Sequence, residues 1–111
     1  EIVEAHHNRK ADAPSGTALL WLRGKAQRPD AEYVFGRHGQ HKRQPNEIGI
    51  HSLRMGNVVG EHEVIFSTDS QTITLKHQAH DRALFAEGAL TAAAFLVGKP
   101  AGLYHMDDLL G

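Results

Sequence analysis

A short segment near the start of the chain carries residue types that can bind an anion. Asp12-Ala13-Pro14-Ser15-Gly16-Thr17 contains turn and helix-start residues, so unpaired backbone N–H groups are expected there. The helix dipole adds partial positive charge, and Gly16 lets a ligand approach the backbone closely. This pattern predicts a site for a carboxylate or a phosphate, although it is also typical of an ordinary capped helix.

Titratable side chains lie immediately upstream of that helix start. His6 and His7 can exchange protons near neutral pH, and Lys10 can pair with a carboxylate or donate a proton. An anion site, a cation and two imidazoles in one short loop indicate binding and acid–base chemistry on a small anionic substrate. Asp12 is instead expected to organise the turn, and Arg9 to face solvent or a partner behind the site.

The elements that position this loop are expected from hydrophobic patterning. Alternating polar and apolar residues predict strands at 1–5, 33–35, 48–55, 61–67 and 72–77. The polar stretch 36–46, with its glycines and proline, predicts an exposed loop. Two helices are expected, one from Thr17 to Pro29 at the latest and one from Asp81 to Gly98. The apolar positions on one face are Leu19, Leu22 and Ala26 in the first helix, and Phe85, Ala89, Ala92 and Leu96 in the second.

This order of elements predicts the fold class. Runs of adjacent strands with few helices are typical of an α+β fold, with a mixed, mostly antiparallel sheet and helices packed on one face. The length of 111 residues predicts a single domain over residues 1–111. No βαβ unit is expected. The chain opens inside a strand and without Met, so we interpret it as a piece of a longer protein.

Composition argues against several classes of function. The formal net charge is −1 and no run rich in Lys and Arg occurs, so no nucleic-acid partner is expected. The chain has no cysteine, which excludes disulfides and thiolate metal sites and fits a cytoplasmic protein. Its apolar stretches are too short for a membrane span, and no signal peptide is visible. Near-neutral charge also removes one barrier to self-association.

Two alternative functions stay open at this stage. The first is a metal-binding domain, because nine histidines are many for this length. The pairs His38/His41 and His77/His80 would share a face only on a helix, however, and no H-E-x-x-H motif is present. The second is a pure assembly module whose alternating strands pair into a homotetramer.

Several motifs together resemble one enzyme family. Glu4-Ala5-His6-His7-Asn8-Arg9-Lys10-Ala11-Asp12-Ala13-Pro14-Ser15-Gly16-Thr17-Ala18 resembles the signature E-x-H-H-x-x-K-x-D-A-P-S-G-T-A of dihydrodipicolinate reductases, also called 4-hydroxy-tetrahydrodipicolinate reductases. Further matches are Ile48–Gly56, Val59–His62, His77–Ala89 and Gly102–Met106. Gln78 departs from the pattern, because many members carry Lys at this position. The resemblance covers essentially the whole chain.

The resemblance implies a two-domain oxidoreductase of lysine and diaminopimelate biosynthesis. In this family an N-terminal Rossmann domain binds NADPH or NADH. A C-terminal domain binds the small dicarboxylate substrate and forms a homotetramer through its sheet. This chain resembles only the second domain, and it contains no G-x-G-x-x-G fingerprint. The cofactor is therefore expected in an N-terminal domain absent from this chain, and the chain alone is expected to be inactive.

The resemblance also assigns roles to individual residues. His6 matches a proton donor and acceptor, and Lys10 matches the general acid that protonates the substrate after hydride addition. The residues that match substrate contacts are His7, Lys10, Ser15, Gly16 and Thr17. For Arg54 and Arg82, which could order the loop or contact a carboxylate, a structural ion pair is the favoured interpretation.

Overall fold

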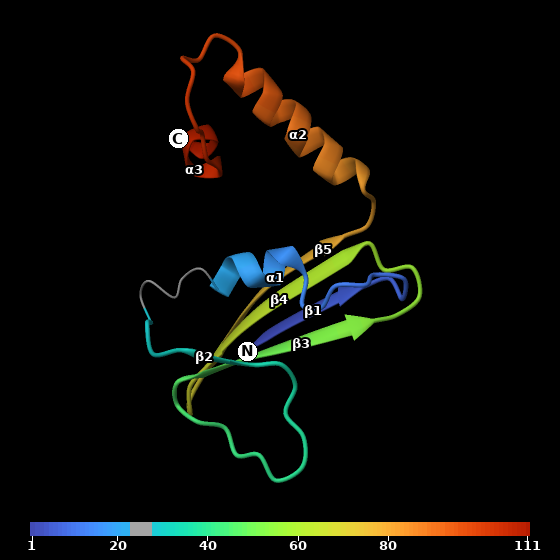
Figure 1. Ribbon diagram of the computed structural model, residues 1–111, viewed down its shortest axis with the longest axis vertical. Helices are drawn as coiled ribbons and strands as arrows, with labels where there is room; N and C mark the ends of the chain where they lie inside the picture. Colours follow the sequence, from blue (N-terminus) through green and yellow to red (C-terminus); the bar gives the residue numbers. More distant parts are fainter. Residues whose placement is uncertain (23–27) are drawn as a thin grey trace. The chain divides into compact units, whose positions relative to one another are not determined.

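The computed structural model describes residues 1–22 and 28–111, which form two compact units, Glu1–His80 and Asp81–Gly111 (Figure 1). The elements of the first unit are β1 (Ile2–His6), α1 (Gly16–Trp21), β2 (Glu32–Val34), β3 (Glu47–Arg54), β4 (Gly60–Ser67) and β5 (Thr72–Ala79). Those of the second unit are α2 (Ala83–Leu96) and α3 (Met106–Leu110). The single domain over 1–111 stays a prediction.

The five strands form one mixed sheet in the order β2-β3-β1-β4-β5. The pairs β2–β3 and β1–β3 are parallel, whereas β1–β4 and β4–β5 are antiparallel. The longest ladder is the antiparallel hairpin of β4 and β5, which runs from Gly60 opposite Ala79 to Ser67 opposite Thr72. The predicted α+β class with a mixed sheet is therefore confirmed.

One topological expectation was wrong, because β1, α1 and β2 form a βαβ unit. β1 and β2 both run parallel to β3 and lie on either side of it. The sequence did not reveal this unit because β2 has only three residues and lies two positions away from β1 in the sheet. Residues 7–15, which connect β1 to α1, contain no glycine, so the unit differs from a dinucleotide-binding one.

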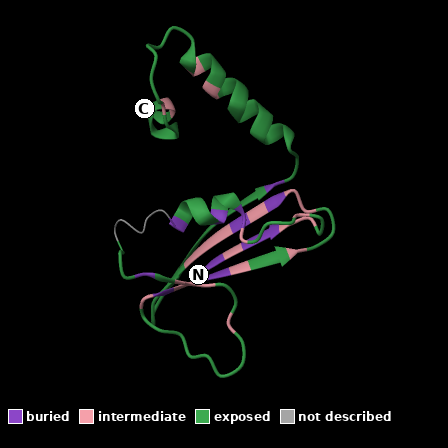
Figure 2. Ribbon diagram, viewed as in Figure 1, coloured by how far each residue is buried: buried purple, intermediate pink, exposed green. Residues whose placement is uncertain are grey.

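The core lies between α1 and the sheet. Ile2 and Ile50 from the central strands pack with Ala18 and Leu22 from the helix segment. Figure 2 shows buried residues on β1 and on the neighbouring parts of β3 and β4. Because burying one Ile or Leu side chain is worth roughly 1.5–3 kcal/mol, this cluster fixes α1 on the sheet.

The predicted packing of a helix on one face of the sheet is confirmed for α1. For α2 the same packing stays a prediction. Leu22 lies on the buried side as predicted, whereas Leu19 is 45% exposed. The predicted continuation of this helix through Gly24 and Ala26 lies outside the described residues.

The second unit begins with the predicted helix. The Asp81 side chain accepts a hydrogen bond from the Ala83 N–H at 2.8 Å, and α2 ends just before Gly98, which has a φ of +76°. The rings of Phe95 and Tyr104 meet edge to face with centroids 6.0 Å apart, which connects α2 to the segment before α3. None of the helices in residues 1–22 and 28–111 is long and apolar enough to cross a membrane.

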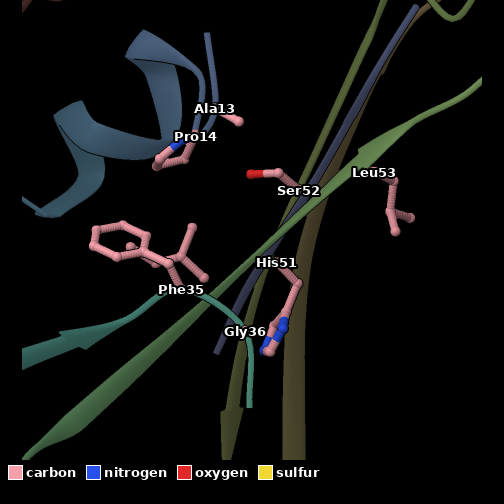
Figure 3. Close-up of a pocket in the computed structure, with 8 residues that line it drawn as sticks. Ala13, Pro14, Phe35, Gly36, His51, Ser52 and Leu53 are labelled. Carbon is pink, nitrogen blue, oxygen red and sulfur yellow. The ribbon is translucent and has the colours of Figure 1, made fainter. Parts of the chain in front are cut away.

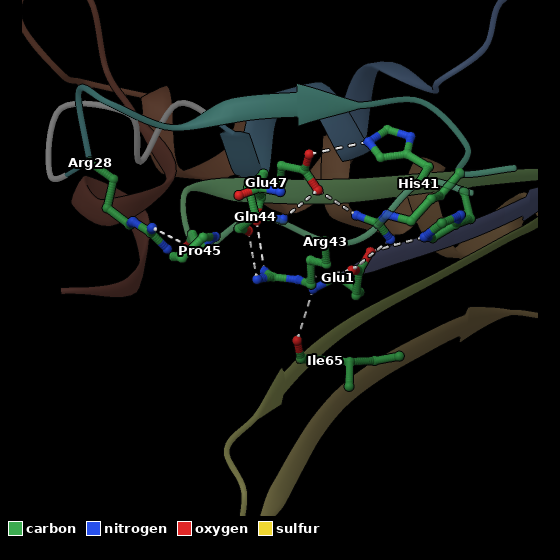
Figure 4. A network of polar contacts seen from close by, with 10 residues as sticks. Glu1, Arg28, His41, Arg43, Gln44, Pro45, Glu47 and Ile65 are labelled. Carbon is green, nitrogen blue, oxygen red and sulfur yellow. Dashed lines mark hydrogen bonds and ion pairs between the residues drawn. The ribbon is translucent and has the colours of Figure 1, made fainter. Parts of the chain in front are cut away.

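A polar network holds the predicted long loop that precedes β3 (Figure 4). The Glu47 carboxylate accepts hydrogen bonds from Arg37 at 2.8 Å and from the Gln44 N–H at 3.2 Å, and His41 lies 3.4 Å away. Arg43 also donates to the Glu47 backbone carbonyl at 2.7 Å. The Arg37 guanidinium is the main reason why the pKa of Glu47 lies below its usual value.

Candidate functional site

The predicted site residues lie at the end of β1, on the loop that follows it, and at the start of α1. His6 is the last residue of β1, and its carbonyl accepts a hydrogen bond from the Met55 N–H at 2.9 Å. The loop then turns, because the Lys10 N–H donates to the His7 carbonyl at 3.1 Å. Gly16 begins α1. The loop is thus attached both to the end of β1 and to the residue that follows β3.

The buried carboxylate of Glu4 is the centre of the site. Arg54 donates to both of its oxygens, at 2.8 and 2.9 Å. His6 Nδ1 lies 2.6 Å from Oε2, and the Ser15 N–H donates to Oε1 at 3.2 Å. Burial alone would raise the pKa of Glu4. Hydrogen bonds from Arg54, Ser52 and His6 outweigh this effect and lower the pKa to about 2.

Strand geometry explains why Glu4 and His6 meet. Residues two apart in a strand point to the same face, so both side chains lie on the face that α1 covers. In the parallel β1–β3 pair, Ser52 lies opposite Glu4 and Arg54 lies opposite His6. No role was predicted for Glu4, although the i, i+2 spacing of Glu and His in a predicted strand could have indicated one.

Ser15 connects the helix start to a second histidine that the sequence analysis did not assign. Ser15 is the N-cap of α1, and its hydroxyl accepts a hydrogen bond from the Ala18 N–H at 3.3 Å. The same hydroxyl lies 2.9 Å from His62 Nε2. Burial lowers the pKa of His62, with a further contribution from the charge of His6, which favours the neutral imidazole in this contact. The His6 and His62 rings also meet edge to face at 5.1 Å.

Lys10 is placed next to this cluster by Asp12. Its ammonium lies 2.7 Å from the Asp12 carboxylate, and this hydrogen bond is the main reason why the pKa of Asp12 is lowered. The Asp12 backbone carbonyl accepts a hydrogen bond from Arg54 at 2.8 Å. Asp12 therefore organises the loop, as the sequence predicted. Arg9 is exposed and donates to Asn57 at 2.6 Å, in agreement with its predicted place outside the site.

The N–H groups of Gly16 and Thr17 belong to the first turn of α1, where the helix has no backbone carbonyl that could accept their hydrogen bonds. Both residues are exposed, and a Cβ added to Gly16 would have no heavy atom within 4 Å. Both residues are therefore accessible to a ligand at the start of α1. Arg54 forms the structural ion pair with Glu4 that the sequence favoured. Arg82 lies at the start of α2, in the second unit.

A cavity of about 340 Å³ adjoins the loop on its other side (Figure 3). Its walls are formed by Ala13, Pro14, Phe35, Gly36 and the β3 residues Ile50 to Leu53. Ser52 points from β3 toward Ala13 and Pro14, whereas Leu53 points away. Among the described residues that line it, His51 alone is titratable. The cavity therefore offers little to a doubly charged ligand.

Among residues 1–22 and 28–111, no group of three or more histidine, aspartate or glutamate side chains could hold a metal ion. At the helix start of the βαβ unit, the Ser15 N–H is donated to the Glu4 carboxylate, so this N–H is not available to a ligand.

Comparison with known proteins identifies the family. Residues 1–110 match the family model described as dihydrodipicolinate reductase, C-terminus. The chain is 53% identical over 112 residues to the 4-hydroxy-tetrahydrodipicolinate reductase of Clostridium tetani, and 49% identical over 113 residues to that of Alkaliphilus metalliredigens. These alignments cover 99% and 100% of the chain but only 44% and 47% of the relatives, so the chain spans about half their length.

A solved structure supports the same relationship. It is the dipicolinate-bound dihydrodipicolinate reductase from Paenisporosarcina sp. TG-14, with 31% identity and a TM-score of 0.62. The match covers 81% of this chain and 36% of that one. On this family match and these relatives, the chain belongs to the dihydrodipicolinate reductases and corresponds to their C-terminal part.

Proposed function

We propose that this chain is the substrate-binding domain of an NADPH- or NADH-dependent reductase that converts 4-hydroxy-tetrahydrodipicolinate to tetrahydrodipicolinate in lysine and diaminopimelate biosynthesis. One observation carries the proposal. Glu4, Arg54 and Asp12 join Lys10, His6 and the start of α1 in one hydrogen-bonded cluster. The first N–H groups of α1, which have no acceptor within the helix, lie beside it. The dipicolinate-bound relative supports it, since dipicolinate is a planar dicarboxylate.

In this proposal the loop binds the substrate through its carboxylates. The Gly16 and Thr17 N–H groups and the Thr17 hydroxyl donate to one carboxylate, and Lys10 supplies a positive charge. His7, the first residue after β1, provides a further contact to the substrate. Ser15, whose hydroxyl and N–H are already engaged, acts by holding the helix start in place.

The proposed chemistry of the loop is proton transfer. The conversion adds a hydride and a proton to the ring and releases the 4-hydroxyl group as water, so an acid must lie close to the reacting atoms. Lys10 is the proposed acid, and it would exchange its Asp12 partner for the substrate. His6 exchanges protons through Nε2, because Nδ1 is bonded to Glu4. The hydride would come from a nicotinamide held by a Rossmann domain outside this chain, so the chain alone should not turn over.

The sheet is proposed to assemble the protein. The alternating strands, the near-neutral charge and the family resemblance favour a homotetramer formed through the sheet. A cytoplasmic location is proposed as well. Light scattering of the purified chain should give the mass of a tetramer, and a monomer at micromolar concentration would count against this assembly.

The function is tested by Lys10→Ala in the full-length protein. Loss of a general acid should lower kcat by about 10²–10⁴-fold. The free energy of unfolding should change by less than about 1 kcal/mol, because Lys10 loses only a pair with an exposed aspartate. Lys42→Ala, in the exposed loop before β3, is the matched control and should keep normal kcat. Near-normal turnover of Lys10→Ala would refute the assignment.

A further inference from the structure

The two ring nitrogens of His6 have different surroundings. Nδ1 lies 2.6 Å from Glu4 Oε2. Nε2 lies close to position 60, since a Cβ added to Gly60 would come within 3.3 Å of it. Only Nε2 is therefore available to exchange a proton with a ligand, and the absence of a side chain at position 60 keeps its surroundings open.

The partners of Glu4 determine which nitrogen of neutral His6 carries the hydrogen. Arg54 is always a donor and occupies one position on each carboxylate oxygen. The Ser15 backbone N–H is also an obligatory donor and contacts Oε1. A carboxylate surrounded in this way stays ionised and can only accept hydrogen bonds. The 2.6 Å contact therefore requires a hydrogen on His6 Nδ1.

We propose that Glu4, held ionised by Arg54, is a positioning residue that fixes His6 as the Nδ1–H tautomer and presents Nε2 as the proton-exchanging atom. This inference deepens the proposed function and rests on it. Because the same carboxylate also accepts from the Ser15 N–H, one buried group sets both the orientation of the imidazole and the position of the helix start. Glu4 acts through these groups and does not touch the substrate.

The variant Glu4→Gln separates this role from a purely structural one. The Gln side chain has one acceptor oxygen and one NH2 donor. The oxygen should occupy the Oε1 position, because two donors that cannot become acceptors, Arg54 and the Ser15 N–H, meet there, whereas Oε2 faces only one such donor, Arg54. The NH2 group then faces His6 Nδ1, which can become an acceptor by moving its hydrogen to Nε2. Glu4→Gln should therefore reverse the His6 tautomer.

Nitrogen-15 NMR of the histidine-labelled 111-residue chain tests this directly. The expected result is Nδ1–H in the wild type and Nε2–H in Glu4→Gln, with circular dichroism showing that both are folded. Glu63→Gln, on the other face of β4, removes the same charge and should leave the His6 tautomer unchanged. The same tautomer in wild type and Glu4→Gln would overturn the proposal.

Kinetics of the full-length protein provide a second test, which can be made even if Glu4→Gln does not fold. If Glu4→Gln folds, kcat should fall by about 100-fold, while KM for the substrate changes far less. If it does not fold, Gly60→Ala takes its place, because a methyl group 3.3 Å from Nε2 should lower kcat by about 10-fold. Unchanged kcat in the folded variant would contradict the role of Nε2. A wild-type protein without reductase activity would instead refute the proposed function, and the tautomer would still test the role of Glu4.

Discussion

Two glutamates in the same sheet each accept hydrogen bonds from an arginine, but their surroundings differ. Glu4 lies in the central strand β1, and its side chain is 0% exposed. Glu47 begins β3, next to the edge strand, and its side chain is 6% exposed. Arg54 bonds both oxygens of Glu4, whereas Arg37 donates to only one oxygen of Glu47.

The histidine beside each glutamate shows what this difference means. His6 lies 2.6 Å from Glu4 and its side chain is 13% exposed, whereas His41 lies 3.4 Å from Glu47 and is 42% exposed. The Glu4 cluster thus holds a titratable ring in one orientation at the start of the proposed site. The Glu47 cluster uses the same residue types to fasten a loop. Residue type alone does not distinguish the two clusters; burial and the number of hydrogen bonds do.

Replacing each of the two arginines should give the largest difference in the free energy of unfolding between the two clusters. Arg54→Ala leaves a fully buried carboxylate without its counter-ion and should lower the free energy of unfolding by about 3–5 kcal/mol. Arg37→Ala should cost less, about 1–2 kcal/mol, because Glu47 keeps the Gln44 N–H and lies closer to solvent. Urea unfolding of both variants measures the difference. Equal losses would show that the two clusters are energetically alike.

The acid stability of the protein should depend on Glu4. The fold lowers the pKa of Glu4 from 4.5 to about 2. The ionised carboxylate therefore adds about 3 kcal/mol to the free energy of unfolding at pH values above 4.5, the pKa of the unfolded chain. This contribution is lost as the pH falls toward 2. Between pH about 6 and about 2, the wild type should lose about that much more stability than Glu4→Gln. Unfolding curves at several pH values measure this, and parallel pH dependences for the two proteins would contradict it.

Loss of the helix cap should have a smaller effect. Ser15→Ala removes the hydroxyl that caps α1 and bonds His62, and should cost about 1–2 kcal/mol. Asp81→Ala at the start of α2 is the matched variant and should cost less than about 1 kcal/mol, because it leaves no buried polar partner. Thermal unfolding distinguishes the two. A loss at Ser15 no larger than that at Asp81 would show that the bond to His62 contributes nothing.

The sequence predicted much of the fold because local patterns determine strands and helix ends. The alternation in β4 and β5 and the glycine after α2 predicted those elements nearly to the residue. The parallel pairing of β1 with β3 could not be predicted, because strands 40 or more residues apart reveal no partner in a single sequence. The βαβ unit was not predicted either, because its second strand, β2, has only three residues and lies at the edge of the sheet.

The site was only partly predictable. The loop residues His6, Lys10 and Ser15 stand close together in sequence, so their proximity was predictable. Glu4, Arg54 and His62 come from three strands, and only the sheet register brings them together. The burial that distinguishes Glu4 from Glu47 also depends on how α1 covers the sheet.

The most direct test of the proposed site is a crystal structure of the full-length protein with dipicolinate. One ligand carboxylate is predicted to lie within roughly 2.7–3.2 Å of the Gly16 and Thr17 amide nitrogens, with Lys10 turned from Asp12 to the ligand. Dipicolinate bound elsewhere, for example in the cavity beside Pro14 and Phe35 with Lys10 still paired to Asp12, would contradict the account.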